Sequence, residues 1–137
     1  MLPNMFDSTS IPVLEQVVNF TQTRHNLLAG NIANLDTPGY RTRDLSTTMF
    51  QSRLQAAIET RDKTASAAPM SGAATSGTDP FSEVDDSLKS ILYHDDSDVG
   101  IEHQITEMTK NQMQHNLALA IMNSQIHLLQ AAVSERA

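Results

Sequence analysis

The last third of the chain repeats apolar residues at helical spacing, and this pattern constrains the fold more than any other feature of the sequence. From Ile101 to Val133 one stripe of residues advances in steps of four and three, the a and d spacing of a heptad repeat. Its members are Ile101, Ile105, Met108, Gln112, His115, Leu119, Met122, Ile126, Leu129 and Val133. The spacing predicts that the C-terminal segment, residues 99–137, forms one long helix from about residue 99 to residue 134, with Asp98 as its N-cap. A helix of this length, about 54 Å at 1.5 Å per residue, favours an elongated molecule.

A second heptad stripe lies near the N-terminus. It consists of Ile11, Leu14, Val18, Thr21, His25, Leu28, Ile32 and Leu35. Ser10 can cap the start of this helix, and Pro12 is tolerated in a first turn. The helix must end before Pro38, because proline pushes the preceding residue towards an extended conformation. The segment Thr37–Tyr40 then suits a type II turn, with proline second and glycine third.

Between these helices the sequence is less regular. Residues 1–45 form the predicted N-terminal helix and its turn, and residues 46–63 suit a short amphipathic helix. Residues 64–80 are almost all Ala, Ser, Thr, Gly or Pro, which favours a flexible linker. Residues 81–98 are acidic and suit extended or turn structure. The predicted fold is all-α, with the two terminal helices packing together as in a coiled coil around a flexible, partly disordered middle.

Composition argues against most kinds of chemistry. The net charge is −7 and the nine Lys and Arg are scattered, which disfavours nucleic-acid binding. With no cysteine there is no disulfide, thiol nucleophile or cysteine zinc site. No apolar run reaches the roughly 18–20 residues of a membrane span, and no basic, apolar signal sequence is visible. Neither metal-ligand spacing nor a nucleophile elbow nor a phosphate loop occurs. We therefore expect no metal, no cofactor and no enzymatic activity.

Formal charge is missing from most of the C-terminal helix. No Asp, Glu, Lys or Arg occurs in the 24 residues between Lys110 and Glu135, where Asn and Gln take their place. A second apolar stripe there consists of Leu117, Ile121, Leu128 and Ala132. Water-facing helices normally carry charges, whereas the centres of protein–protein contacts are depleted of them. We infer that other copies or other proteins enclose both terminal helices, and we expect these helices to be largely unfolded or molten in the isolated subunit, because neighbours provide most of the burial. The predicted packing and assembly residues are Ile11, Leu14, Val18, Leu28, Leu35, Ile101, Ile105, Met108, Leu119, Met122, Ile126, Leu129 and Val133.

The segment from Leu28 to Arg41 carries a more specific pattern. It resembles the N-terminal signature of the flagellar axial proteins, the family of rod, hook and hook-associated proteins: Asn-Ile/Leu-Ala-Asn, one residue, Asp/Asn-Thr-Pro-Gly-Tyr/Phe and then a basic residue. The matching signature positions are Asn31, Ile32, Ala33, Asn34, Asp36, Thr37, Pro38, Gly39 and Tyr40. The short chain lacks the large inserted domain of hook and distal rod proteins. Within the family, the continuation from Tyr40 to Leu45 and the stretch from Met108 to Asn116 resemble the proximal rod proteins.

The resemblance implies a structural role. Such proteins leave the cytoplasm through the flagellar type III export apparatus without a cleaved signal, and they polymerise helically in the periplasm into the rod that transmits torque. It implies self-association and contacts with other rod proteins and with the junction of the MS ring and export gate, without nucleic acid or a membrane span. Two alternatives remain, a short rod protein of another type and a soluble coiled-coil adaptor. The adaptor would share the heptads but would have no reason for the signature.

Overall fold

The fold is seen in a computed structural model that describes residues 9–66, 81–85, 88–89, 91–92 and 100–134. The chain divides into two compact units, residues 1–44 with 92–137 and residues 45–91. Helices account for nearly all of the regular structure in the described residues, so the all-α prediction is confirmed. Asp98, the predicted N-cap, and residues 67–80 of the predicted linker lie outside the described residues.

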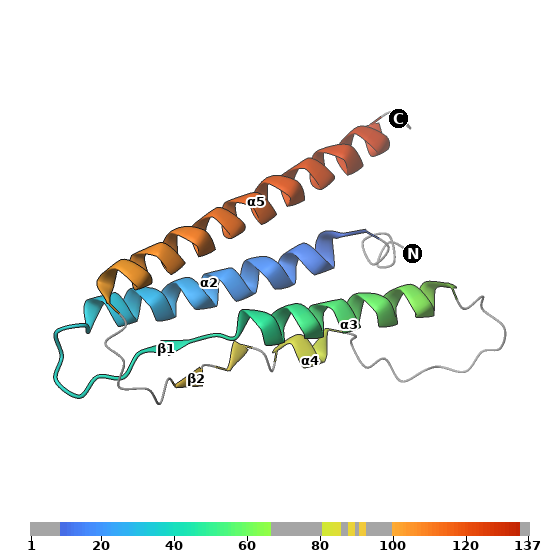
Figure 1. The fold of residues 1–137 in the computed structure, drawn as a ribbon. Coiled ribbons are helices and arrows are strands. Elements are labelled where there is room, and N and C mark those ends of the chain that lie inside the picture. Colours follow the sequence, from blue (N-terminus) through green and yellow to red (C-terminus); the bar gives the residue numbers. More distant parts are fainter. Residues whose placement is uncertain (1–8, 67–80, 86–87, 90, 93–99, 135–137) are drawn as a thin grey trace. The chain divides into compact units, whose positions relative to one another are not determined.

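The first unit is built on α2 (Ile11–Ala33) and α5 (Ile101–Ser134). The two helices run antiparallel and pack against each other, which confirms the predicted pairing of the terminal helices (Figure 1). They diverge towards the C-terminal end of α5 (Figure 1). At the start of α2 the backbone carbonyl of Ser10 accepts a hydrogen bond from the Leu14 N–H at 3.0 Å. The Ser10 side chain makes no capping bond; instead the hydroxyl of Thr9 accepts the Ile11 N–H at 3.3 Å.

The contact between α2 and α5 is more polar than the apolar stripes predict. On α5 the buried residues are Gln104, Asn111 and Ala118, spaced seven apart. On α2 they are Phe20, Thr21, Arg24, Leu28 and Asn31. Predicted stripe members Met108, His115, Met122 and Leu129 are half-buried. The other members of the predicted α5 stripe are exposed. Where the pattern predicts that residues 105, 112 and 119 contact α2, the structure instead buries the residue before each of them, 104, 111 and 118.

Two short strands follow the signature turn and precede α5 in the chain. These are β1 (Arg43–Asp44) and β2 (Ile91–Leu92), which pair in a two-stranded sheet. Strand β1 also packs against α2. The boundary between the two units passes through β2.

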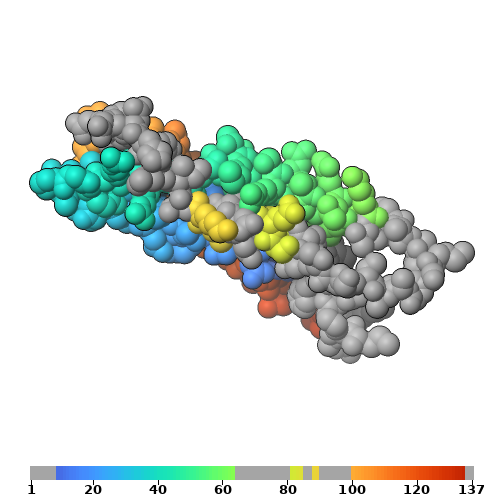
Figure 2. Space-filling view, turned by 90° about the horizontal axis from the view of Figure 1, so that it is seen from below, coloured from blue at the N-terminus to red at the C-terminus, as the bar shows by residue number. Residues whose placement is uncertain are grey.

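The second unit contains α3 (Thr47–Ser66) and the single-turn helix α4 (Ser82–Asp85), which lie side by side (Figure 2). Its buried residues are Leu45, Phe50, Ala57, Phe81 and Val84. The Arg53 guanidinium donates to the Glu83 carbonyl at 2.8 Å and ties the two helices together. Helix α3 continues three residues into the stretch for which the composition predicts a linker, and α4 replaces part of the predicted extended region.

Candidate functional site

Asn31 holds the signature segment together. Its side chain is 1% exposed. The amide nitrogen donates to the Arg43 carbonyl at 2.7 Å, and the amide oxygen accepts the Arg43 N–H at 3.1 Å. The same amide group donates to Gln104 Oε1 at 3.2 Å and accepts from the Tyr40 hydroxyl at 3.2 Å. The side chain thus pairs with a backbone residue as a neighbouring strand would, and it links α2, the turn, β1 and α5.

Asn34 ends the N-terminal helix. Its side-chain amide donates to the Gly30 carbonyl at 2.8 Å, and its own N–H approaches the same oxygen at 3.2 Å. These bonds satisfy a carbonyl that the end of a helix leaves without a partner. The helix therefore stops at Ala33, and Leu35, a predicted stripe residue, lies beyond its end. Ile32 and Leu35 are half-buried, while Ala33 is exposed.

The turn itself has the geometry that the sequence predicts. The Tyr40 N–H donates to the Thr37 carbonyl at 3.1 Å, and Gly39 has a φ of 76°. A positive φ at the third position is what a type II turn requires, and glycine adopts it without a steric penalty. Asp36, Thr37 and Pro38 are exposed. The Tyr40 side chain is 38% exposed, and its hydroxyl is fastened to Asn31 of the same chain.

Replacing Gly39 with alanine is expected to destabilise the first unit by about 1–2 kcal/mol, because an L residue with this φ brings its Cβ too close to the backbone. No other atom lies within 4 Å of the added methyl group, so backbone strain alone would act. Gly100→Ala is the matched control, since its methyl group also meets nothing within 4 Å and its φ is not in the left-handed region. Urea unfolding followed by far-UV circular dichroism measures both. Equal losses in the two variants would contradict the strain.

Arg24 is the centre of a buried ion cluster that the sequence pattern did not reveal. Its Nε and Nη2 donate to the two carboxylate oxygens of Asp44, each at 2.8 Å. Nη2 also donates to Glu107 Oε2 at 2.9 Å, and the other oxygen of Glu107 binds Lys110 Nζ at 2.8 Å. The Arg24 side chain is only 6% exposed. The cluster joins α2, β1 and α5, and hydrogen bonding to Asp44 raises the pKa of Arg24 above its ordinary value in spite of desolvation.

The hydrogen bonds from Lys110 and then Arg24 lower the pKa of Glu107 below its ordinary value. A carboxylate with a lowered pKa stabilises the fold above the unfolded-state pKa, and this stabilisation is lost as the pH falls through the folded-state pKa. We therefore expect the first unit to lose this contribution as the pH falls from the ordinary pKa of a glutamate to the lowered pKa of Glu107. The Glu107→Gln variant, measured by thermal unfolding as a function of pH, should show a shallower acid loss. If the stability of the parent chain and of Glu107→Gln fell equally with pH, Glu107 would not contribute to the acid sensitivity of the first unit.

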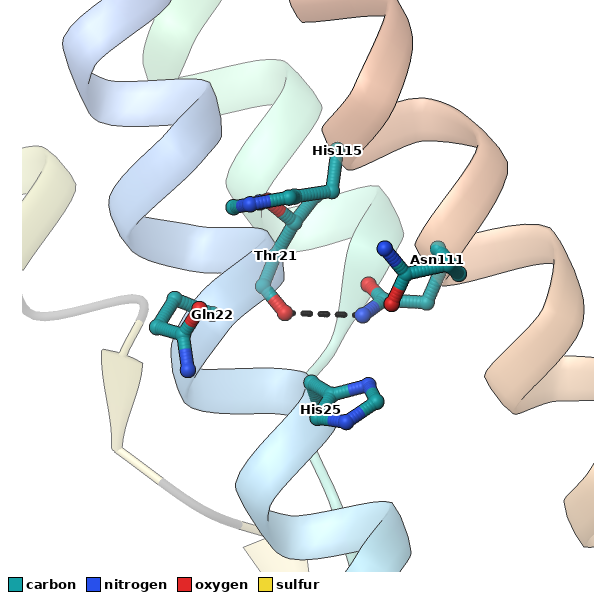
Figure 3. A pocket seen from close by; sticks show the side chains of 6 residues that line it. Thr21, Gln22, His25, Asn111 and His115 are labelled. Atoms are coloured by element: carbon teal, nitrogen blue, oxygen red, sulfur yellow. Dashed lines mark hydrogen bonds between the residues drawn. The ribbon is translucent and has the colours of Figure 1, made fainter. Parts of the chain in front are cut away.

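A polar pocket lies beside the cluster, between α2 and α5. It has a volume of about 180 Å³ and is lined by Thr21, Gln22, His25, Asn111, Gln112 and His115 (Figure 3). The Asn111 amide donates to the Thr21 carbonyl at 2.7 Å. The Thr21 hydroxyl lies 2.9 Å from His115 Nδ1 and also contacts the Val17 and Val18 carbonyls. In the described part of the chain no group of three or more His, Asp or Glu side chains is placed to hold a metal ion.

Much of the apolar surface of α5 is exposed in the first unit. Its first apolar stripe, Ile105, Leu119, Ile126 and Val133, is between 38% and 61% exposed. Its second apolar stripe, Leu117, Ile121 and Leu128, is between 40% and 62% exposed. Leu117 and Leu119 flank the buried Ala118, so each is rotated by about 100° from it, on opposite sides of α5. The helix therefore presents one apolar stripe on each side of its contact with α2.

The predicted packing residues divide between these environments. Leu28 is buried in the helix pair, while Ile11, Leu14, Val18, Met108, Met122 and Leu129 are half-buried. Ile101 is 51% exposed, and the residues of the first apolar stripe are exposed to similar degrees. The structure thus leaves several apolar side chains exposed at positions that the sequence predicts for packing or assembly. The polar residues Gln104 and Asn111, which the sequence did not single out, occupy the contact with α2, and their seven-residue spacing was the available signal.

Helix α5 is also the one described helix that is long and apolar enough to cross a membrane, by length and composition alone. Gln114, Asn116, Asn123 and Gln125 all lie on it, and an amide without a hydrogen-bond partner is costly in a hydrocarbon environment. A protein partner can accommodate such amides with hydrogen bonds. The apolar stripes are therefore better suited to protein neighbours than to lipid.

Comparison with known proteins shows what the chain is similar to. The chain is 28% identical over 120 residues to the flagellar basal body rod protein FlgB of Salmonella typhimurium, covering 82% of this chain and 83% of that protein. It is 26% identical over 118 residues to FlgB of Escherichia coli, with the same coverage. It is 24% identical over 131 residues to FlgB of Aquifex aeolicus, covering 93% and 94%. The chain is a homologue of the flagellar rod protein FlgB. No family model and no solved structure matches it.

The homology to FlgB confirms the resemblance that the signature indicated. It extends over most of the chain, including the C-terminal helix, and so covers more than the signature alone. Because FlgB is a flagellar rod protein, the homology implies a structural subunit of the basal-body rod and gives no support to a catalytic family.

Proposed function

We propose that the chain is a proximal subunit of the flagellar rod, and that it polymerises through the apolar stripes of α5 with copies of itself and with other rod proteins. One observation carries this proposal: α5 turns polar residues towards α2 and leaves two apolar stripes in contact with solvent. Fully burying an exposed Leu or Ile side chain contributes roughly 1.5–3 kcal/mol, and covering the remaining half of these side chains would contribute about half of that for each residue.

The two stripes also suit an open assembly. Head-to-tail contacts need two different surfaces on each subunit, and such contacts extend into a helical polymer when the rotation does not close a ring. The first stripe runs from Ile105 to Val133, whereas the second is confined to the region from Leu117 to Leu128. Their different lengths provide two non-equivalent faces. A wall of such paired helices would transmit torque along the rod.

The signature has a separate part in this proposal. Asn31, Asn34 and the turn at Gly39 fix where the chain leaves α2 and hold β1 against it. Every copy would then present α2 and α5 in the same relative position. The exposed ring of Tyr40 is available for a neighbouring subunit, while its hydroxyl stays bound to Asn31.

The proposal includes a route and a place. Export through the flagellar type III apparatus without a cleaved signal would bring the subunit to the periplasmic rod, near the MS ring and export gate. FlgB homology favours this type over a FlgC-type rod protein. The turn anchored by Asn31 supports this proposal over a coiled-coil adaptor, which has no use for such a turn.

Basal bodies purified from cells that produce the epitope-tagged full chain test the proposal directly. We expect the tagged chain to remain with the rod after the export apparatus and hook have been removed. A chain that is absent from basal bodies and forms a stable dimer by itself in solution would instead be an adaptor. Deletion of the gene should leave basal bodies without a completed rod, and motile deletion cells would contradict the proposal.

A further inference from the structure

Two buried side-chain atoms in the described part of the chain have no hydrogen-bond partner within the protein, and they lie at the same pocket. These atoms are His25 Nδ1 and Asn111 Oδ1, and both residues line the pocket between α2 and α5 (Figure 3). Asn111 is 1% exposed. Because its amide nitrogen is committed to the Thr21 carbonyl at 2.7 Å, turning the amide over would lose that bond without a net gain.

The antiparallel arrangement of α2 and α5 brings these two residues to the same pocket. Thr21 of α2 meets His115 of α5, with 2.9 Å between the hydroxyl oxygen and Nδ1. One turn further along each helix, in opposite directions, stand His25 and Asn111. The pocket between them is about 180 Å³ and has polar residues on all sides. A water molecule needs about 30 Å³ and two to four polar partners, so the pocket has room and chemistry for one.

We propose that this pocket binds an ordered water molecule that donates one hydrogen to His25 Nδ1 and the other to Asn111 Oδ1, and that the hydrated pair helps to fix the register of α2 on α5. The proton of neutral His25 then resides on Nε2, which leaves Nδ1 as an acceptor. The site lies within a single chain and does not depend on the proposed role in the rod.

The register follows from the partners that each polar group requires. In the observed alignment Asn31 meets Gln104, Arg24 meets Glu107 and His25 faces Asn111. A slide of one heptad would put Gly100 or Gln114 in place of Glu107. The same slide would put Gln104 or Ala118 in place of Asn111, and the alanine offers no acceptor for the water. A buried polar residue at one heptad position specifies register in this way.

Side-chain nitrogen NMR of the full chain tests the water directly. We expect His25 in the Nε2–H form and a nuclear Overhauser contact between water and the Asn111 side-chain amide. His25→Phe should abolish that contact, whereas the control His127→Phe, at an exposed position on α5, should preserve it. An Nδ1–H form of His25, or loss of the water contact in the control alone, would overturn the proposal. A side chain from a second copy in the pocket, seen in a crystal structure, would do so too.

Disulfide trapping tests the register, and the absence of native cysteine makes each crosslink unambiguous. Leu28→Cys with Met108→Cys reports the observed alignment, and Leu28→Cys with His115→Cys reports a slide of one heptad. With His25 and Asn111 intact, we expect the first pair alone to crosslink within one chain. When both His25→Leu and Asn111→Leu are introduced, the shifted pair should crosslink as well. An unchanged single register in that background would overturn the role in register.

Discussion

Cells that carry Leu119→Asp are expected to lack assembled rods and to be non-motile. Leu119 is 38% exposed in the subunit and belongs to the first apolar stripe, so the helix pair itself should tolerate the carboxylate. In the proposed assembly the same position is covered, and an unpaired charge buried there costs several kcal/mol per contact. Because that cost recurs in every subunit of the polymer, even a few kcal/mol would prevent growth. Swimming in soft agar and electron microscopy of purified basal bodies measure the outcome.

His127→Asp is the matched control for this variant. It introduces the same carboxylate on the same helix, at an exposed position about 180° round α5 from the buried Ala118 and therefore between the two apolar stripes. We expect normal rods and normal swimming from it. Far-UV circular dichroism of both purified variants should match the parent chain, which separates failed assembly from failed folding. Normal motility of the Leu119→Asp cells would show that the first apolar stripe is not an assembly surface.

The Arg24→Met variant is expected to lose about 3–5 kcal/mol of stability in the first unit. Removing the guanidinium leaves Asp44 and Glu107, whose side chains are 13% and 19% exposed, without the cation that both of them bind. Since small domains are stable by only about 5–15 kcal/mol, this loss would remove a large part of the stability of the α2–α5 pair. The stability of Arg24→Lys should fall between that of the parent chain and that of Arg24→Met. It retains the charge, but an ammonium group cannot reproduce the bidentate contact with Asp44. Urea unfolding followed by far-UV circular dichroism measures the series.

The control for this series is Arg61→Met. Arg61 is paired with Asp62 on α3, where the aspartate side chain is 63% exposed, and surface pairs of this kind contribute about 0–1 kcal/mol. A loss from Arg24→Met no larger than that of Arg61→Met would mean that the cluster is not a determinant of stability. A large loss from Arg24→Met with full recovery in Arg24→Lys would assign the effect to charge alone.

Much of the signature region could be predicted from its residue types. Pro38 and Gly39 have narrow conformational preferences, so the place and type of the turn follow from local chemistry. The bonds of Asn31 could not be predicted in this way. Its partners Arg43 and Gln104 lie 12 and 73 residues away in the chain, and only the folded structure brings them together.

The helix contact shows the same division. Heptad spacing locates both helices because local periodicity determines which residues share a face. The spacing predicts that the apolar positions are buried, because it depends on hydrophobicity alone and takes no account of hydrogen-bond partners. The structure instead buries Gln104 and Asn111, because Asn31 and the Thr21 carbonyl pay their desolvation cost with hydrogen bonds. Similarly, Arg24 is an isolated charge in the sequence pattern, and only the folded structure places Asp44 and Glu107 beside it.

The sequence by itself determined the two terminal helices, the turn between Thr37 and Tyr40, and the resemblance to flagellar rod proteins. All three depend on spacing or on the preferences of residues close together in the chain. Only the tertiary structure decided which side of α5 faces α2 and which apolar side chains stay exposed. That choice depends on matched donors, acceptors and charges from distant segments, and their pairing energies exist only once the helices meet.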